Sequence, residues 1–202
     1  MKFFTRSLLI LPVTLFCSWA FCQTPKTMKD YLNIPGPISF NNISYNLSWT
    51  SHPASNFYKH EYIVKGDNAD KFRSMLLIDV ITGNTNVKEI VAGKVDELKK
   101  IKAQNPVVNY QSFDNPKTGE YMIDFLLTAN AADGTVSIAE HNIYRYKKFT
   151  DKSGKTGVML FGVSTRSYGN DITAFLNQLK TTKSKLVEQV AQFNIPTITI
   201  AN

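Results

Sequence analysis

The sequence predicts a single α+β domain: an antiparallel β-sheet of about 6–7 strands flanked by two helices, in an α/β/α sandwich. Three observations lead to this prediction. Three runs of residues are almost continuously apolar, which is typical of strands covered on both faces. Two longer segments carry apolar residues at helical spacing. Short turns separate consecutive strands, which favours antiparallel pairing over a doubly wound parallel sheet.

The predicted domain covers residues 38–193. Its first residues, ISFNNISYNLSWT, predict two short strands joined by a turn at Asn41 and Asn42, and residues 57–64 predict the next strand. Residues 136–146 have a mixed pattern that indicates a partly exposed strand. The three apolar runs predict the centre of the sheet: FRSMLLIDVI (72–81), YMIDFLL (121–127) and VMLFGV (158–163).

Two segments have the period of an α-helix. The first follows Asn86, a predicted N-cap with Glu89 as its capping-box partner, and stops at Asn105 and Pro106. The second covers about residues 172–193. Its apolar stripe is expected to face the sheet and consists of Ile172, Phe175, Leu176, Leu179, Leu186, Val190 and Phe193.

The first 22 residues predict a Sec-type secretory signal peptide that is cleaved after Cys22. Lys2 and Arg6 precede an apolar stretch shorter than the ~20 residues that span a bilayer. The mature chain is therefore expected to be periplasmic or secreted, with no transmembrane segment. Lipidation of Cys22 is an alternative, but the bulky Phe21 before it argues against a lipoprotein site.

The two ends of the mature chain have little periodic pattern. Residues 23–37 contain three prolines and a glycine, and predict a linker or extended lead-in. Residues 194–202 predict a C-terminal tail or a short edge strand.

Composition excludes several kinds of chemistry. Both cysteines, Cys17 and Cys22, lie in the leader. The mature chain therefore has no thiol for disulfides, thiolate catalysis or a cysteine zinc site. Without the two basic residues of the leader, 21 basic residues face 16 acidic ones, a net charge of +5. These charges are dispersed and export separates the chain from nucleic acid, so no nucleic-acid partner is predicted.

The segment TDKSGKTGVMLF (150–161) contains Gly154, Lys155 and Thr156, which resemble the end of a phosphate-binding P-loop. A P-loop also needs a glycine five residues before the Gly-Lys pair, where this chain has Phe149, and a helix after it. Here a β-rich run follows instead. The segment is therefore predicted to be a tight turn between two strands.

Asp79 and Asp124 each interrupt a strongly apolar strand. Two interpretations are open. Paired buried carboxylates divide acid and base roles in many hydrolases, so both aspartates are candidate catalytic residues. Alternatively, each points to a rim of the sheet or forms a structural ion pair with Arg73, Arg145 or Arg166. The three histidines lack metal-binding spacing, so no metal and no cofactor are predicted.

One stretch mixes aromatic and basic residues, and a neighbouring strand adds two more. Such a surface can stack on and pair with a ligand, although aromatic residues on a strand also serve cross-strand packing. We expect it to bind a partner, either an unknown protein or a small anionic ligand. Substitution of its basic residues is expected to weaken partner capture without lowering the melting temperature. Its residues are Tyr144, Arg145, Tyr146, Lys147, Arg166 and Tyr168.

The order of elements, with an aromatic-rich opening strand that contains Tyr45 and Trp49 and is followed by Pro53, resembles the PsbP-like and DcrB-like α/β sandwich proteins. The resemblance covers residues 38–193. It implies an accessory or binding role without a catalytic site, and it carries over no functional residue. The sequence therefore favours an exported, non-catalytic binding or accessory protein of the bacterial periplasm or cell envelope. The alternative is a small hydrolase that uses Asp79 and Asp124.

Overall fold

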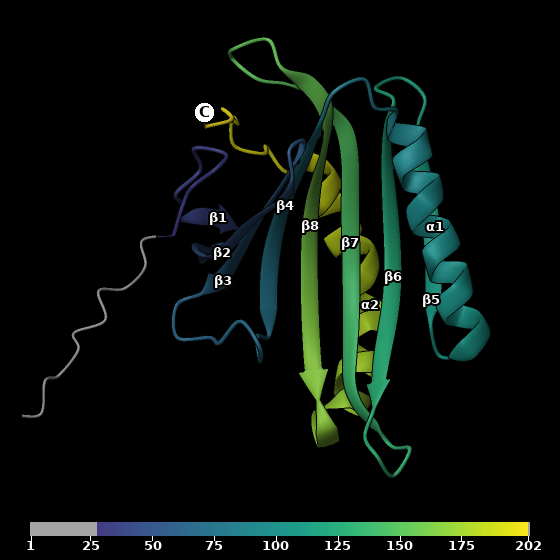
Figure 1. The fold of residues 1–202 in the computed structure, drawn as a ribbon. Helices are drawn as coiled ribbons and strands as arrows, with labels where there is room; N and C mark the ends of the chain where they lie inside the picture. The colour runs from purple at the N-terminus through teal and green to yellow at the C-terminus, as the bar shows by residue number, and fades with distance from the viewer. Residues whose placement is uncertain (1–27, 202) are drawn as a thin grey trace, which may run out of the picture.

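The computed structural model describes residues 28–201, so the predicted signal peptide lies outside the described residues. The described part contains one eight-stranded antiparallel sheet in the order β1-β2-β3-β4-β8-β7-β6-β5 and two α-helices (Figure 1). The strands are β1 (Ile38–Phe40), β2 (Ile43–Ala54), β3 (Phe57–Val64), β4 (Ser74–Thr82), β5 (Asn109–Asn115), β6 (Glu120–Asn130), β7 (Val136–Thr150) and β8 (Thr156–Tyr168). The helices are α1 (Val87–Gln104) and α2 (Ile172–Gln192).

Two predicted turns are confirmed. Asn41 and Asn42 join β1 to β2 with positive φ angles of 50° and 63°, which asparagine tolerates better than most residues. Between β7 and β8, the Asp151 carboxylate accepts hydrogen bonds from the backbone N–H groups of Ser153 and Lys155, and Gly154 has a φ of 84°. The GKT segment is therefore a hairpin turn and not a phosphate loop.

The predicted α/β/α sandwich is wrong. The sheet has eight strands instead of six or seven, and only 24% of the described residues are helical. A helix is about 10 Å across and strands lie about 4.8 Å apart, so one helix covers only two or three strands. Helix α1 packs on β5, β6 and β7, whereas α2 packs on β7 and β8 from the opposite face (Figure 1). Neither face is enclosed by a helical layer.

The two ends of the described part of the chain complete the face on which α2 lies. Leu32, Ile34, Ile198 and Ile200 are buried in the same core cluster as β3, β4 and β8. The Thr199 N–H donates to the carbonyl of Leu32 over 3.0 Å, which holds the two ends together. The segments predicted as a linker and a tail thus contribute core residues, because they cover strands that α2 does not reach.

Strand β5 was not predicted. Its sequence, NYQSFDN, is largely exposed and forms one edge of the sheet, where it pairs only with β6. An edge strand that buries few side chains has no need for an apolar pattern, so hydrophobic periodicity gives no signal for it.

Neither helix of the described residues is long and apolar enough to cross a membrane. Because α1 lies over β5–β7, the same face of the sheet is not covered by helix over β3 and β4. This uncovered region borders the side of α1 and forms a cavity.

Candidate functional site

The cavity beside α1 has a volume of about 340 Å³. Strand register builds its floor: Lys59 of β3 lies opposite Asp79 of β4, and Asp79 lies opposite Leu160 of β8, so all three side chains project from one face of the sheet. The wall comes from α1. We call this the α1 cavity, and its lining residues are Phe57, Lys59, Leu77, Asp79, Ile81, Ile90, Lys94, Glu97, Tyr144, Tyr146, Val158 and Leu160.

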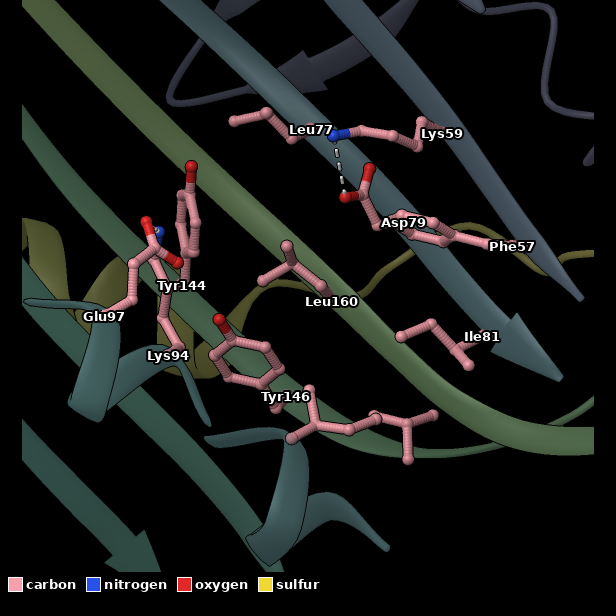
Figure 2. Close-up of a pocket in the computed structure, with 12 residues that line it drawn as sticks. Phe57, Lys59, Leu77, Asp79, Ile81, Lys94, Glu97, Tyr144, Tyr146 and Leu160 are labelled. Carbon is pink, nitrogen blue, oxygen red and sulfur yellow. Dashed lines mark hydrogen bonds and ion pairs between the residues drawn. The ribbon is translucent and has the colours of Figure 1, made fainter. Parts of the chain in front are cut away.

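The polar groups stand on two sides of an apolar floor. Figure 2 shows Lys59 and Asp79 on one side and Tyr144, Lys94 and Glu97 on the other. Pockets of several hundred Å³ with apolar walls and a few polar groups are the usual form of small-molecule sites.

Asp79 is the most unusual group in this cavity. Its Oδ2 lies 3.5 Å from the ammonium of Lys59, but its Oδ1 is buried with no hydrogen-bond partner. Burial raises the pKa of Asp79 to about 6, and the positive charge of Lys59 offsets only part of that rise. A buried carboxylate oxygen without a donor is a costly arrangement in a ligand-free protein.

The opposite side of the cavity is held by α1. The Lys94 ammonium lies 2.9 Å from Glu97 Oε1 and 5.9 Å from the centroid of the Tyr144 ring. Burial raises the pKa of the Tyr144 and Tyr146 hydroxyls far above their ordinary value, so both remain protonated and able to donate hydrogen bonds.

The structure divides the aromatic and basic stretch of β7 between the two faces of the sheet. Tyr144 and Tyr146 line the α1 cavity, whereas Arg145 and Lys147 alternate with them and lie on the α2 side next to Glu120. The six residues predicted as one binding surface are therefore not brought together.

Arg145 has a structural role. Its guanidinium forms an ion pair with Glu120 at 2.9 Å and donates to the carbonyl groups of Val190 and Phe193, at the end of α2. The Arg145 side chain is only 11% exposed, so it offers little surface to a partner. Its substitution is now expected to lower the melting temperature, contrary to the expectation from the sequence.

Arg166 and Tyr168 lie on the α1 face of β8, and Arg166 lines a small cavity together with Tyr144. Arg166 stacks on the ring of Phe72 at 4.1 Å, and the Tyr168 hydroxyl donates to the Phe72 carbonyl over 2.9 Å. An ion pair with Glu140 also restrains Arg166. Together with Lys71, these two residues line a second cavity of about 590 Å³, near the start of α2.

The structure does not bring Asp79 and Asp124 together. Asp124 lies on the α2 face and Asp79 on the α1 face, so the sheet separates their carboxylates. Asp124 Oδ1 is 2.7 Å from His141 Nε2, and its Oδ2 is 2.9 Å from the ammonium of Lys183. Burial raises the pKa of Asp124, but the hydrogen bonds from His141 and Lys183 outweigh burial and hold it below its ordinary value.

His60, one of the other two histidines, serves the fold. His60 is fully buried, and its Nε2 accepts a hydrogen bond from the backbone N–H of Tyr31, so its ring proton lies on Nδ1 and points to the Tyr62 hydroxyl. Residues 28–201 contain no group of three or more His, Cys, Asp or Glu side chains that could hold a metal ion.

A protein-family model matches residues 32–195, and the chain belongs to this family, whose function is unknown. The match includes Leu32 and Ile34, in the segment before β1. Comparison with curated proteins and with solved structures finds no significant match.

Proposed function

We propose that this protein is an exported, non-catalytic binding or accessory protein of the bacterial periplasm or cell envelope, and that the α1 cavity is its ligand site. Of the two partner classes expected from the sequence, a protein or a small anionic ligand, the size and the concave, partly open shape of the α1 cavity favour a small molecule.

The observation that carries this proposal is the unpaired Oδ1 of Asp79 in an apolar cavity. A ligand that donates a hydrogen bond to the Asp79 carboxylate stabilises a buried charge that Lys59 alone compensates only in part. Phe57, Leu160 and Tyr146 supply an apolar and aromatic surface beside it. The ligand class is therefore a small molecule with an apolar body and one donor group.

The charges of the cavity do not select an anion. Two lysines, Lys59 and Lys94, are each paired with a carboxylate of the same cavity, Asp79 and Glu97. With no net charge in the lining, affinity depends on apolar contact and on the hydrogen bond to Asp79.

The hydrolase alternative required Asp79 and Asp124 to act on one substrate. Catalytic carboxylate pairs lie within about 10 Å of each other on either side of the reacting bond. The two aspartates belong to cavities on opposite faces of the sheet, so this alternative loses its geometric basis.

N-phenyl-1-naphthylamine is a suitable probe, because it is apolar and carries one N–H donor and no charge. We expect its fluorescence to rise on binding to the mature protein at pH 7.5. Replacement of Ile90, which lines the cavity from α1, by Trp should fill the cavity and weaken binding at least tenfold. Asp79→Asn should weaken binding about three- to tenfold, since an amide is a poorer acceptor than a carboxylate.

Ala92→Trp is the matched control, because Ala92 is exposed on α1 and lines none of the described cavities. It should leave probe affinity unchanged. If Ile90→Trp and Ala92→Trp bind the probe equally well while both remain folded, the α1 cavity is not the site and the proposal fails.

A further inference from the structure

Helix α2 packs loosely on the sheet along most of its length. Of its 21 residues only Ile172 and Val190, near its two ends, are buried. Leu176 and Leu179, from the stripe that was expected to be buried, are only half-buried. The middle of the helix therefore leaves space between itself and the sheet.

That space includes a cavity of about 650 Å³ between α2 and strands β5 and β6. We call it the α2 cavity. Leucines form its apolar wall, and polar side chains of β5 and α2 surround them. Its lining residues are Asn109, Tyr110, Gln111, Asp124, Leu126, His141, Leu176, Leu179, Lys180, Lys183 and Ser184.

Two lysines of α2 line this cavity, and one of them is held in place from below. The Asp124 carboxylate, 2% exposed, lies 2.9 Å from the ammonium of Lys183 and also accepts a hydrogen bond from His141. Lys180, three residues earlier on the same helix face, donates a hydrogen bond to the side-chain oxygen of Asn177 over 2.9 Å.

The charges in the lining do not cancel. Asp124 is the one carboxylate among the lining residues, and it already has two partners. Lys180 and Lys183 thus leave an excess positive charge beside an apolar wall. In contrast, each lysine of the α1 cavity has a carboxylate of its own.

We propose that the α2 cavity binds a small amphipathic anion: an alkyl chain with a carboxylate or phosphate head group. The alkyl chain contacts Leu126, Leu176 and Leu179, and burial of its methylene groups against them favours binding. The head group lies between Lys180 and Lys183, with Asp124 fixing the position of Lys183. This site is independent of the α1 cavity, since the two lie on opposite faces of the sheet.

Three probes with the same chain length separate the contributions. Octanoate, octanol and octylamine are titrated into the mature protein at pH 7.5 and low salt, with calorimetry as the readout. Octanoate should bind at one site at least tenfold more tightly than octanol or octylamine. Octyl phosphate, measured beside octanoate, tells which head group the lysines prefer.

Lys180→Met is the first variant, because it removes one cation and leaves the ion pair of Asp124 with Lys183 intact. It should weaken octanoate binding three- to tenfold, and Leu176→Trp, which fills the cavity, should abolish it. Lys185→Met removes an exposed lysine of the same helix that does not line the cavity, and should change nothing.

Each contrary result is decisive. Octylamine binding as tightly as octanoate would assign the head-group position to Asp124 and overturn the proposal. No measurable octanoate binding, or equal losses from Lys180→Met and Lys185→Met, would also overturn it. Loss of octanoate binding in Ile90→Trp would place the chain in the α1 cavity instead.

Discussion

The ammonium of Lys59 lies 3.5 Å from one carboxylate oxygen of Asp79, while the other oxygen is buried without any partner. This half-satisfied carboxylate has a pKa of about 6, raised by burial from an ordinary value of 3.8. Between pH 3.8 and about 6, Asp79 is therefore protonated in the folded state and ionised in the unfolded state. By linkage, the contribution of Asp79 to stability falls as the pH rises from about 4 to about 6.

Asp79→Asn is expected to stabilise the protein at pH 7.5. Two pKa units correspond to about 3 kcal/mol, and partial relaxation reduces the gain to about 1–3 kcal/mol. Urea denaturation at pH 7.5 and pH 4.5 measures this, and the gain should be largely absent at the lower pH. Asp96→Asn, at an exposed ion pair with Lys99, should leave the stability essentially unchanged. A variant that is less stable than the wild type at pH 7.5 would contradict this account of Asp79.

Arg145→Ala is expected to destabilise the protein by about 2–4 kcal/mol, because it leaves the partly buried Glu120 and the carbonyl groups at the end of α2 without their donor. Lys147→Ala is the matched comparison on the same strand. Lys147 is 35% exposed and lies 3.9 Å from Glu120, so its loss should cost less than about 0.5 kcal/mol. Thermal unfolding of both variants tests whether Arg145 has a structural role. Equal melting temperatures for the two variants would refute that role.

The local elements of this fold could be predicted from the sequence. Asn86 does cap α1, since its side chain accepts a hydrogen bond from the backbone N–H of Lys88. The apolar runs do form β4, β6 and β8. Strands β4 and β8 are neighbours at the centre of the sheet, where both faces are buried, whereas β6 lies beside the edge strand β5 and is buried only in its middle residues. These signals depend only on near neighbours in the chain.

The extent of helical coverage could not be predicted in the same way. An apolar stripe on α2 shows which side of the helix faces the sheet, but not how closely it packs. The half-buried Leu176 and Leu179 border a cavity, and Ile198 and Ile200 take over part of the covering role. Which segment covers which part of the sheet depends on tertiary packing, and hydrophobic periodicity does not encode it.

The candidate site was predicted only in part. Tyr144, Tyr146 and Asp79 do line one cavity, but the sequence grouped the two tyrosines with Arg145. Strand alternation was available as a signal that neighbouring residues point to opposite faces. The role of Lys59 and Lys94 gave no signal, because their positions opposite Asp79 and over Tyr144 follow from strand register and from the placement of α1.

His60 should make the protein sensitive to acid. Burial lowers the pKa of His60 below its ordinary value of 6.5, with the carboxylate of Asp30 opposing part of that effect. As the pH falls, His60 is therefore protonated in the unfolded state before it is protonated in the folded state. The free energy of unfolding decreases as the pH falls below 6.5. His60→Gln keeps a side-chain acceptor for the Tyr31 N–H but cannot titrate. Urea denaturation at pH 7.5 and 5.5 should show a smaller acid loss in the variant than in the wild type, and an equal loss would count against this role.

Gly157 is required where β8 pairs with Thr82 of β4. A Cβ atom there would overlap the backbone carbonyl of Ile81, and backbone atoms cannot move aside without breaking the pairing of the two strands. Gly157→Ala should therefore cost about 2–4 kcal/mol. Gly93 of α1 has open space around its Cα, so Gly93→Ala should stabilise the helix by about 0.5–1 kcal/mol. Urea denaturation of both variants should give changes of opposite sign, and a Gly157→Ala protein as stable as the wild type would show that β8 and β4 are less closely packed than described.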